Sequence, residues 1–339
     1  MPTLTETIAA LRAGQDLSRD QSRALFEQIM TGAVEPEPMG ELLEALAAKG
    51  ETVDEITGAA DVMNEKVTRV SCDGDCIDTC GTGGDGISTF NVSTTAALLA
   101  AAAGATVAKH GNVTHTRASG SAEAMRELGI NLDAPVPVLE RCLRECRIAF
   151  LFAPHLHPAM KHAGPVRKKL GIRTIFNLLG PLTNPAGAKR QVLGVPEPEL
   201  VDKIAGVLAA REATHAWVVH GDGLCDLTVT GQTQVAEVRD GRIKTFNVHP
   251  HDVGLENAGL GELIVVSATE SSHVIRNILT GKDESARRDH ALLNGGAALV
   301  VAGLADDLSA GVAQAQDAIT SGAAGETLEQ LVKLSNAEG

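Results

Sequence analysis

Between residues 78 and 121 the sequence joins a glycine-rich loop to the start of a helix, and no other run constrains the fold as strongly. It reads DTCGTGGDGISTFNVSTTAALLAAAAGATVAKHGN and then VTHTRASGS. A strand-like stretch around residues 76–79 leads into four glycines among residues 81–86, and an Ala/Leu-rich helix follows. Glycine lets the backbone approach a ligand closely, and a helix start presents unpaired N–H groups and a positive dipole end. The run therefore predicts a strand–loop–helix unit that binds an anion, usually phosphate.

The loop differs from the two common nucleotide-binding fingerprints. A P-loop requires a lysine after its second glycine, and no lysine follows Gly84 or Gly86. The spacing Gly81-x-Gly83-x-x-Gly86 matches the bare dinucleotide pattern. However, the helix begins several residues late, and no acidic residue ends a second strand near position 100. The context thus disfavours a dinucleotide.

Polar side chains accumulate around this loop, although a glycine-rich turn can exist without a ligand. They are Asp85, Asn91, Ser93, Thr94, Lys109 and Asn112. Hydroxyls at 93 and 94 can also cap a helix, and capping is compatible with phosphate binding. A second anion-binding loop, Lys109-His110-Gly111-Asn112, follows the first. Two such loops on one βαβ-like unit predict a ligand with more than one phosphate.

Composition excludes several classes of function. The 339 residues are 44% hydrophobic and 21% charged, which suits two domains or one large one. A net charge of −14, one tryptophan and no tyrosine disfavour a nucleic-acid partner, but a local cationic pocket can still bind a small anion. No run approaches membrane-spanning length and no basic-then-apolar signal opens the chain. We expect a cytoplasmic protein with no membrane contact.

The six cysteines do not have the spacing of a common metal site. Cys72, Cys76 and Cys80 are each separated by three residues, and Cys142 and Cys146 lie one helical turn apart. Zinc knuckles prefer tighter pairs, and iron–sulfur clusters have other spacings. We expect reduced thiols that are buried individually.

The pattern of elements predicts an α/β fold with a small N-terminal helical domain. The first 65 residues contain capping boxes at Ser18–Gln21 and Thr52–Glu55. Apolar stripes at 25, 26, 29 and 30 and at 42, 43 and 46 are predicted to pack a helical layer. We then expect strands at 105–108, 148–152, 192–195 and 216–220, helices at 122–128 and 197–210, and a hairpin of 234–238 and 243–248 on Asp240-Gly241. This alternation predicts a central, mostly parallel sheet flanked by helices.

Ordered motifs along nearly the whole chain resemble those of anthranilate phosphoribosyltransferases. They are Asp-Thr-x-Gly-Thr-Gly-Gly-Asp at 78–85, Asn-x-Ser-Thr at 91–94, Lys-His-Gly-Asn at 109–112, Phe-Ala-Pro at 152–154, His-Pro-Ala-Met at 157–160, Val-Arg-Lys-Lys-Leu-Gly at 166–171, Arg-Thr-Ile-Phe-Asn-Leu-Leu-Gly-Pro-Leu-Thr-Asn-Pro at 173–185 and His-Gly-Asp-Gly-Leu at 220–224. One such motif is a weak signal, and several in the right order are a strong one.

The resemblance implies transfer of a phosphoribosyl group from phosphoribosyl pyrophosphate to the amine of anthranilate, the second step of tryptophan biosynthesis from chorismate. It also implies Mg2+ and a homodimer formed through the helical domain. The implied domains are a helical one of residues 1–70, joined by 157–185 that fold back onto it, and an α/β one of 71–156 and 186–339. The active site is then expected between them.

The resemblance also implies the ligands of each substrate. Phosphoribosyl pyrophosphate is expected on Gly81, Thr82, Gly83, Gly84, Asp85, Thr89, Asn91, Ser93, Thr94, Lys109 and Ser121. Anthranilate is expected on Gly81, His110, Asn112, Pro154 and Arg167, with Arg173 as the alternative to Arg167. The chemistry agrees, because N–H groups and hydroxyls bind phosphates, Lys109 supplies a point charge, and an arginine pairs with a carboxylate. Arg167 can also be part of a solvated helix face.

No side-chain nucleophile is expected in this reaction. His110 is a possible general base, but an aromatic amine needs little help before it attacks. We therefore expect His110 to serve mainly as a binding residue.

Three positions depart from the family pattern. Val113 stands where the family usually has an arginine on the pyrophosphate, and Arg117 is the candidate replacement. The family usually has Asp-Glu where this chain has Cys225-Asp226. The expected Mg2+ ligands are therefore Ser93 and Asp226, with Cys225 a poor match for a hard cation. His162 replaces a tyrosine found in several members, which is a mild change.

Two other functions fit parts of the sequence. A nucleoside phosphorylase would also need a glycine-rich phosphate loop, but the segment around Arg167 and the Lys-His-Gly-Asn motif favour the transferase. The departures at 113 and 225 are compatible with a catalytically reduced paralogue that binds nucleic acid. The acidic balance and the few aromatic residues argue against that paralogue.

Overall fold

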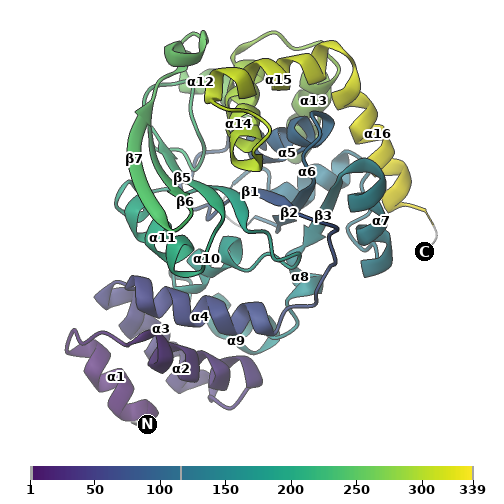
Figure 1. Ribbon diagram of the computed structural model, residues 1–339. Coiled ribbons are helices and arrows are strands. Elements are labelled where there is room, and N and C mark those ends of the chain that lie inside the picture. The colour runs from purple at the N-terminus through teal and green to yellow at the C-terminus, as the bar shows by residue number, and fades with distance from the viewer. Residues whose placement is uncertain (1–2, 115–116, 338–339) are drawn as a thin grey trace.

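The computed structural model describes residues 3–114 and 117–337, which form a small helical layer and a larger α/β unit (Figure 1). The helical layer holds the N-terminus and lies on one side of the central sheet, and the C-terminal helices lie on the other. The predicted fold class is confirmed.

Four N-terminal helices build the helical layer. They are α1 (Leu4–Arg12), α2 (Arg19–Thr31), α3 (Pro36–Lys49) and α4 (Val53–Glu65). The predicted capping boxes open α2 and α4, where the cap side chain and the residue three positions on satisfy each other's backbone N–H groups. Both predicted apolar stripes are buried in one core, with Phe26, Leu42 and Leu46 all 0% exposed. The two stripes therefore form part of the hydrophobic core within a single chain.

A later segment returns to this layer. Helix α9 (Met160–Leu170) packs against α2 and α3, and α10 (Phe176–Leu179) packs against α4. The rings of Phe26 and Phe176 meet edge to face at 5.7 Å. A short 3-10 helix, η1 (Gly180–Leu182), then leads back to the sheet. Residues between α9 and α10 are thus carried by the helical layer.

Within the described residues, the central sheet has seven strands in the order β3-β2-β1-β4-β5-β6-β7. They are β1 (Ile77–Gly81), β2 (Val107–Gly111), β3 (Ile148–Phe152), β4 (Arg190–Gly194), β5 (His215–Gly221), β6 (Thr233–Arg239) and β7 (Arg242–Val248). The strands from β3 to β5 in this order are parallel, and the predicted β6–β7 hairpin is antiparallel. It turns at Asp240 and Gly241, whose φ angles of 49° and 75° are both positive.

One predicted strand is shifted. The stretch 105–108 was expected to end before Lys109, but β2 begins at Val107 and continues to Gly111. Register pairing with β3 joins Lys109 to Phe150 and His110 to Leu151. Both residues therefore belong to the strand and have buried side chains, and the second predicted loop begins only at Asn112.

Helices cover both faces of the sheet. They are α5 (Val92–Ala102), α6 (Ser121–Glu127), α7 (Val136–Cys146), α8 (Ala153–Leu156), α11 (Glu199–Ala210), α12 (Leu260–Leu263), α13 (Ala268–Leu279), α14 (Ala286–Ala302), α15 (Leu308–Thr320) and α16 (Ala323–Ser335), with the 3-10 turn η2 (Pro250–Val253). Alternate residues of β5 enter two cores: Trp217 and Val219 face one, and Ala216 and Val218 face the core shared with the helical layer. The apolar stretch 297–302 is the end of α14.

The strand order places a topological switch point between β1 and β4. From β1 the chain runs through α5 to β2 on one side, whereas β4 lies on the other side of β1 and leads through α11 to β5. The loops after β1 and β4 therefore diverge at the carboxyl edge of neighbouring parallel strands. Open α/β sheets bind ligands at such a point.

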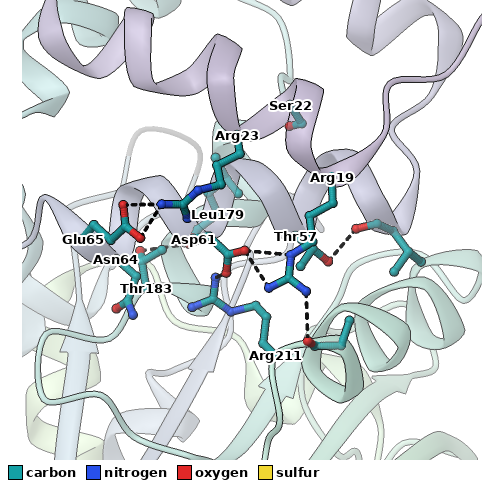
Figure 2. Close-up of polar contacts among 12 residues, drawn as sticks. Arg19, Ser22, Arg23, Thr57, Asp61, Asn64, Glu65, Leu179, Thr183 and Arg211 are labelled. Carbon is teal, nitrogen blue, oxygen red and sulfur yellow. Dashed lines mark hydrogen bonds and ion pairs between the residues drawn. The ribbon is translucent and has the colours of Figure 1, made fainter.

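An ion-pair network joins the helical layer to the α/β unit (Figure 2). Asp61 of α4 accepts hydrogen bonds from Arg19 Nε at 2.9 Å and from Arg211 Nη1, just after α11, at 3.1 Å. Arg19 also donates to the carbonyl of Ala210 at 3.4 Å. Arg23 pairs with Glu65 within the helical layer. Asp61 thus holds arginines from both parts of the molecule.

The cysteines are free, and all but the half-buried Cys72 are buried, as expected. No helix in residues 3–114 and 117–337 is long and apolar enough to cross a bilayer.

Candidate active site

The glycine-rich loop follows β1 at the switch point. Thr82 N donates to the carbonyl of Gly194 on β4 at 2.9 Å, which holds the start of the loop against the neighbouring strand. Gly83, Gly84 and Gly86 have φ angles of 65°, 94° and 70°. Other residues are strained in this region, so the glycines allow the loop to curl back before α5.

Asn91 is the N-cap of α5, and its side chain makes no capping hydrogen bond within the described residues. The Asn91 side chain instead bonds Ser119 and Ser271. The hydroxyl of Ser93 accepts a hydrogen bond from Lys109 Nζ at 3.4 Å, while the buried Thr94 hydroxyl has no partner among the described residues. Capping therefore does not explain the hydroxyls at 93 and 94.

Lys109 lies beneath the loop. Its side chain is 1% exposed, and Nζ donates to the carbonyl of Thr79 at 2.6 Å. Burial lowers the pKa of Lys109, and the charge of the buried Asp78 opposes that shift. Asp78 in turn accepts from the backbone N–H of His110 and from the amide of Asn184. The lysine is thus anchored under Ser93.

Asp85 is engaged within the protein. Arg117 binds both its carboxylate oxygens, with Nε to Oδ1 at 2.7 Å. The backbone N–H of Cys225 also donates to Asp85, at 3.2 Å. The Asp85 side chain is 0% exposed. The Asp85 carboxylate therefore joins the Arg117 guanidinium to the 222–226 loop.

Ser93, Cys225 and Asp226, the expected metal ligands, line one cavity with Thr79 and Asn294. Burial, with a smaller contribution from Asp85, raises the pKa of Asp226 to about 7, and Arg117 and Lys109 oppose the rise. The Asp226 carboxylate has no hydrogen bond or ion pair to any residue that the structure describes. A Cβ at Gly194 would lie 1.5 Å from the carbonyl oxygen of Cys225, so only glycine lets β4 approach this loop.

These donors fit Mg2+ as a partial ligand set. The free carboxylate of Asp226 and the Ser93 hydroxyl are hard oxygen donors, and the Cys225 thiol is not. No group of three or more His, Cys, Asp or Glu side chains could hold a metal in residues 3–114 and 117–337. A magnesium ion here would depend on oxygens of its substrate for the rest of its shell.

His110 forms a buried pair with His157. Their Nε2 atoms lie 3.1 Å apart, so one ring donates and the other accepts. Burial lowers the pKa of His110 to about 3, with His157 contributing, and burial lowers that of His157 to about 4. Both rings are neutral at pH 7, which makes His110 a weak base and supports its expected role as a binding residue.

The other residues expected at anthranilate lie on separate elements. The Arg167 guanidinium of α9 lies over the Phe176 ring, 5.3 Å from its centroid, and burial lowers the pKa of Arg167. No hydrogen bond or ion pair engages this guanidinium in the part of the chain that is described. Asn112 and Pro154 are exposed, after β2 and in α8. Free donors on Arg167 suit a carboxylate, but no hydrogen bond, ion pair or ring contact joins these three described residues.

The remaining expected residues lie around the loop. Gly81 ends β1, and the buried hydroxyl of Thr89 has no partner in the described chain. Ser121 Oγ bonds the backbone of Asn112 at both N and O. The motifs contained two residues whose place was not anticipated: His157 beside His110, and Asn184, which joins Asp78 to the carbonyl of Ala108. Their only sequence signal was their position within the quoted motifs.

The family models show that this chain, with its phosphate-type loop at the switch point and its helical layer beside the sheet, is a glycosyl transferase. The models of the glycosyl transferase family match residues 73–325 as its a/b domain and residues 5–67 as its helical bundle domain. The anthranilate phosphoribosyltransferase of Anaeromyxobacter dehalogenans is 51% identical over 330 residues, covering 97% of this chain and 98% of its own.

Solved structures agree. The crystal structure of anthranilate phosphoribosyltransferase from Thermus thermophilus superposes with a TM-score of 0.92 at 38% identity, covering 98% of this chain and 99% of its own. The enzyme from Saccharomyces cerevisiae in complex with phosphoribosyl pyrophosphate and Mg has a TM-score of 0.89 at 26% identity, with 98% and 97% covered. The chain belongs to the anthranilate phosphoribosyltransferase family.

Proposed function

We propose that this protein transfers the 5-phosphoribosyl group from phosphoribosyl pyrophosphate to the amine of anthranilate, giving N-(5-phosphoribosyl)anthranilate and pyrophosphate. The main structural support is the glycine loop at the switch point, with Lys109 buried beneath Ser93 and a free Asp226 in the adjoining cavity. Family membership supports the same reaction.

The loop binds the phosphoribosyl pyrophosphate. Backbone N–H groups of Gly83 and Gly84 and the hydroxyls of Ser93 and Thr94 donate to its oxygens beside Gly81 and Thr82, and Lys109 adds a positive charge from below. The wider set also includes Asp85, Thr89, Asn91 and Ser121. Because Arg117 binds Asp85 in the structure, this arginine takes the place of the missing one at 113.

Anthranilate binds with its carboxylate on Arg167 and Asn112, and His110 and Pro154 line its ring. The neutral His110 orients the amine rather than removing its proton, which passes to water or to the departing pyrophosphate once the C–N bond has formed. The transition state has oxocarbenium character, so the protein acts by aligning the amine with the departing pyrophosphate and by offsetting the charge that develops there.

Magnesium, when bound, neutralises the leaving pyrophosphate. Asp226 and Ser93 hold it, with Cys225 a weak contributor at most. The yeast relative was solved with phosphoribosyl pyrophosphate and Mg, which supports the same requirement here.

We also infer a cytoplasmic homodimer that forms through the helical domain. Leu42 and Leu46 of the apolar stripes are buried within one chain, so the dimer contact uses other residues of that domain. Light scattering on the purified protein measures the mass, and a monomer at micromolar concentration contradicts this part.

The activity test uses the loss of anthranilate fluorescence when phosphoribosyl pyrophosphate and Mg2+ are supplied. We expect turnover that a chelator abolishes. No turnover at saturating Mg2+, or turnover that the chelator leaves intact, contradicts the proposal. Phosphorolysis of nucleosides would support the phosphorylase alternative instead, and salt-sensitive retention of oligonucleotides would support a nucleic-acid-binding one.

A further inference from the structure

Arg173 reaches from the helical layer to the carboxyl edge of the sheet. It lies between α9 and α10, which pack on α2, α3 and α4. Its side chain nevertheless meets the loops that follow β1 and β4. A Cβ placed on Gly84 would lie 3.4 Å from Arg173 Nη1 and 3.9 Å from the Pro196 ring. The guanidinium therefore lies at the switch point, where α/β sheets bind their ligands.

Arg173 forms an ion pair with an exposed carboxylate. Nη1 pairs with Glu197 at 3.3 Å, and the two side chains are 35% and 60% exposed. A long, solvated pair of this kind contributes little stability and exchanges readily for a better acceptor. Glu51 is a second carboxylate within reach of the Arg173 charge, and Lys203 also acts on Glu51.

A hydrogen-bond donor of Arg173 is left unused. Nη2 is buried and has no acceptor among the residues that the structure describes. A buried guanidinium donor without an acceptor is costly, so it marks a place where an acceptor belongs. The neighbouring loop offers phosphate-binding N–H groups, and a fork of guanidinium donors matches the oxygens of a phosphate.

We propose that Arg173 is a further ligand of the pyrophosphate group, donating to a phosphate oxygen through the unpaired Nη2 while Nη1 releases Glu197 when the substrate binds. The glycine loop then has guanidinium groups on both sides, Arg173 at Gly84 and Arg117 at Asp85. Because Arg173 is carried by the helical layer, the contact also links this layer to the substrate. The inference rests on the proposed function, but only in taking pyrophosphate as a ligand of this site.

Titration calorimetry with Mg2+ and pyrophosphate tests the contact without turnover. In Arg173→Gln the affinity for pyrophosphate should fall roughly ten- to a hundredfold, the usual range for losing a hydrogen bond to a charged group. Arg173→Lys should retain part of it, because the charge stays and the fork is lost. Lys169→Gln, the same charge change at an exposed residue of α9, should bind as wild type. The apparent affinity for anthranilate should change little in all three.

Glu197→Gln distinguishes binding of pyrophosphate by Arg173 from a purely structural role of the Arg173–Glu197 ion pair. Without the competing carboxylate, pyrophosphate should bind at least as tightly as in wild type. An unchanged pyrophosphate affinity in Arg173→Gln overturns the inference, as does a loss confined to anthranilate or an equal loss in Glu197→Gln. These results leave the proposed function intact if wild type turns over. A wild type that neither binds pyrophosphate nor turns over overturns both.

Discussion

Cys225 is the side chain in the candidate site whose chemistry suits its expected role least. It is 3% exposed beside Asp226, and its thiol is a poor ligand for Mg2+. Cys225→Asp should therefore lower the Mg2+ concentration needed for half-maximal rate. It should also destabilise the metal-free protein, because a new buried carboxylate joins Asp85 and Asp226 with only Arg117 and Lys109 to offset it.

Rate measurements over a Mg2+ series and melting curves with and without Mg2+ and pyrophosphate check this prediction. Cys225→Ser is the control, since it changes the size of the side chain little and adds no charge. Asp226→Ala should raise the Mg2+ requirement, and by more than Cys225→Asp lowers it. If neither substitution shifts the requirement, the 222–226 loop holds no metal.

Arg167 offers a guanidinium that pairs with no other residue in the described structure and lies over Phe176. Arg167→Ala should raise the KM for anthranilate by a factor of order ten to a hundred, because a charged hydrogen bond contributes roughly 1.5–3 kcal/mol. The KM for phosphoribosyl pyrophosphate should barely move. Lys168→Ala on the exposed side of α9 is the matched control. A loss on the phosphate substrate instead would mean that Arg167 is misassigned.

His290 is 0% exposed, and neither ring nitrogen has a partner in the described part of the chain. Burial lowers the pKa of His290 to about 3. Between pH 6.5 and 3 this histidine is therefore protonated in the unfolded chain but not in the folded one. Protonation of His290 therefore does not reduce the free energy of unfolding above pH 6.5, and it reduces this free energy progressively as the pH falls toward 3. In urea unfolding, His290→Leu should lose less stability than wild type between pH 7 and pH 5. Parallel profiles would contradict this.

At the scale of elements, the contact between the end of β4 and the 222–226 loop depends on one glycine. Gly194→Ala would place a methyl group 1.5 Å from the carbonyl oxygen of Cys225, so the strand and the loop must separate. We expect a loss of about 1–3 kcal/mol in the free energy of unfolding, typical of overpacking. We also expect a higher Mg2+ requirement, because Asp226 moves with the loop.

Gly261→Ala is the control for this substitution, since nothing lies within 4 Å of its Cβ position in α12. Urea unfolding and Mg2+ titration of both variants provide the comparison. Wild-type values for Gly194→Ala would show that the loop yields without affecting the site.

At the scale of the whole molecule, Asp61 holds the helical layer to the α/β unit (Figure 2). Its side chain is 17% exposed and that of Arg211 is 14% exposed. Asp61→Asn should cost about 1–3 kcal/mol of stability, because it leaves Arg19 and Arg211 without their shared charge. Asp75→Asn, in a pair where Asp75 is 75% exposed, should cost under about 1 kcal/mol. Equal losses in urea unfolding would mean that the junction contributes no more than a surface pair.

Much of the fold follows from local sequence. The capping boxes at Ser18 and Thr52, the strand at 148–152 and the Asp240-Gly241 hairpin were predicted because each depends on residues a few positions apart. The shifted start of β2 shows the limit of such patterns. Lys109 and His110 look like loop residues in sequence, but Asp78 and Thr79 on β1 pair with them inside the sheet. Partners about thirty residues away outweighed local polarity.

The sequence by itself determined the family, the glycine loop and the identity of most candidate ligands, because short motifs encode backbone conformation and donor chemistry directly. Only the tertiary structure decided which of these residues meet. It buried Lys109 under Ser93, paired Asp85 with Arg117 and left the Asp226 carboxylate without a partner among the described residues. It also brought Arg173 from the helical layer to Gly84. These contacts join residues far apart in the chain, and their geometry depends on how strands and helices pack rather than on any local pattern.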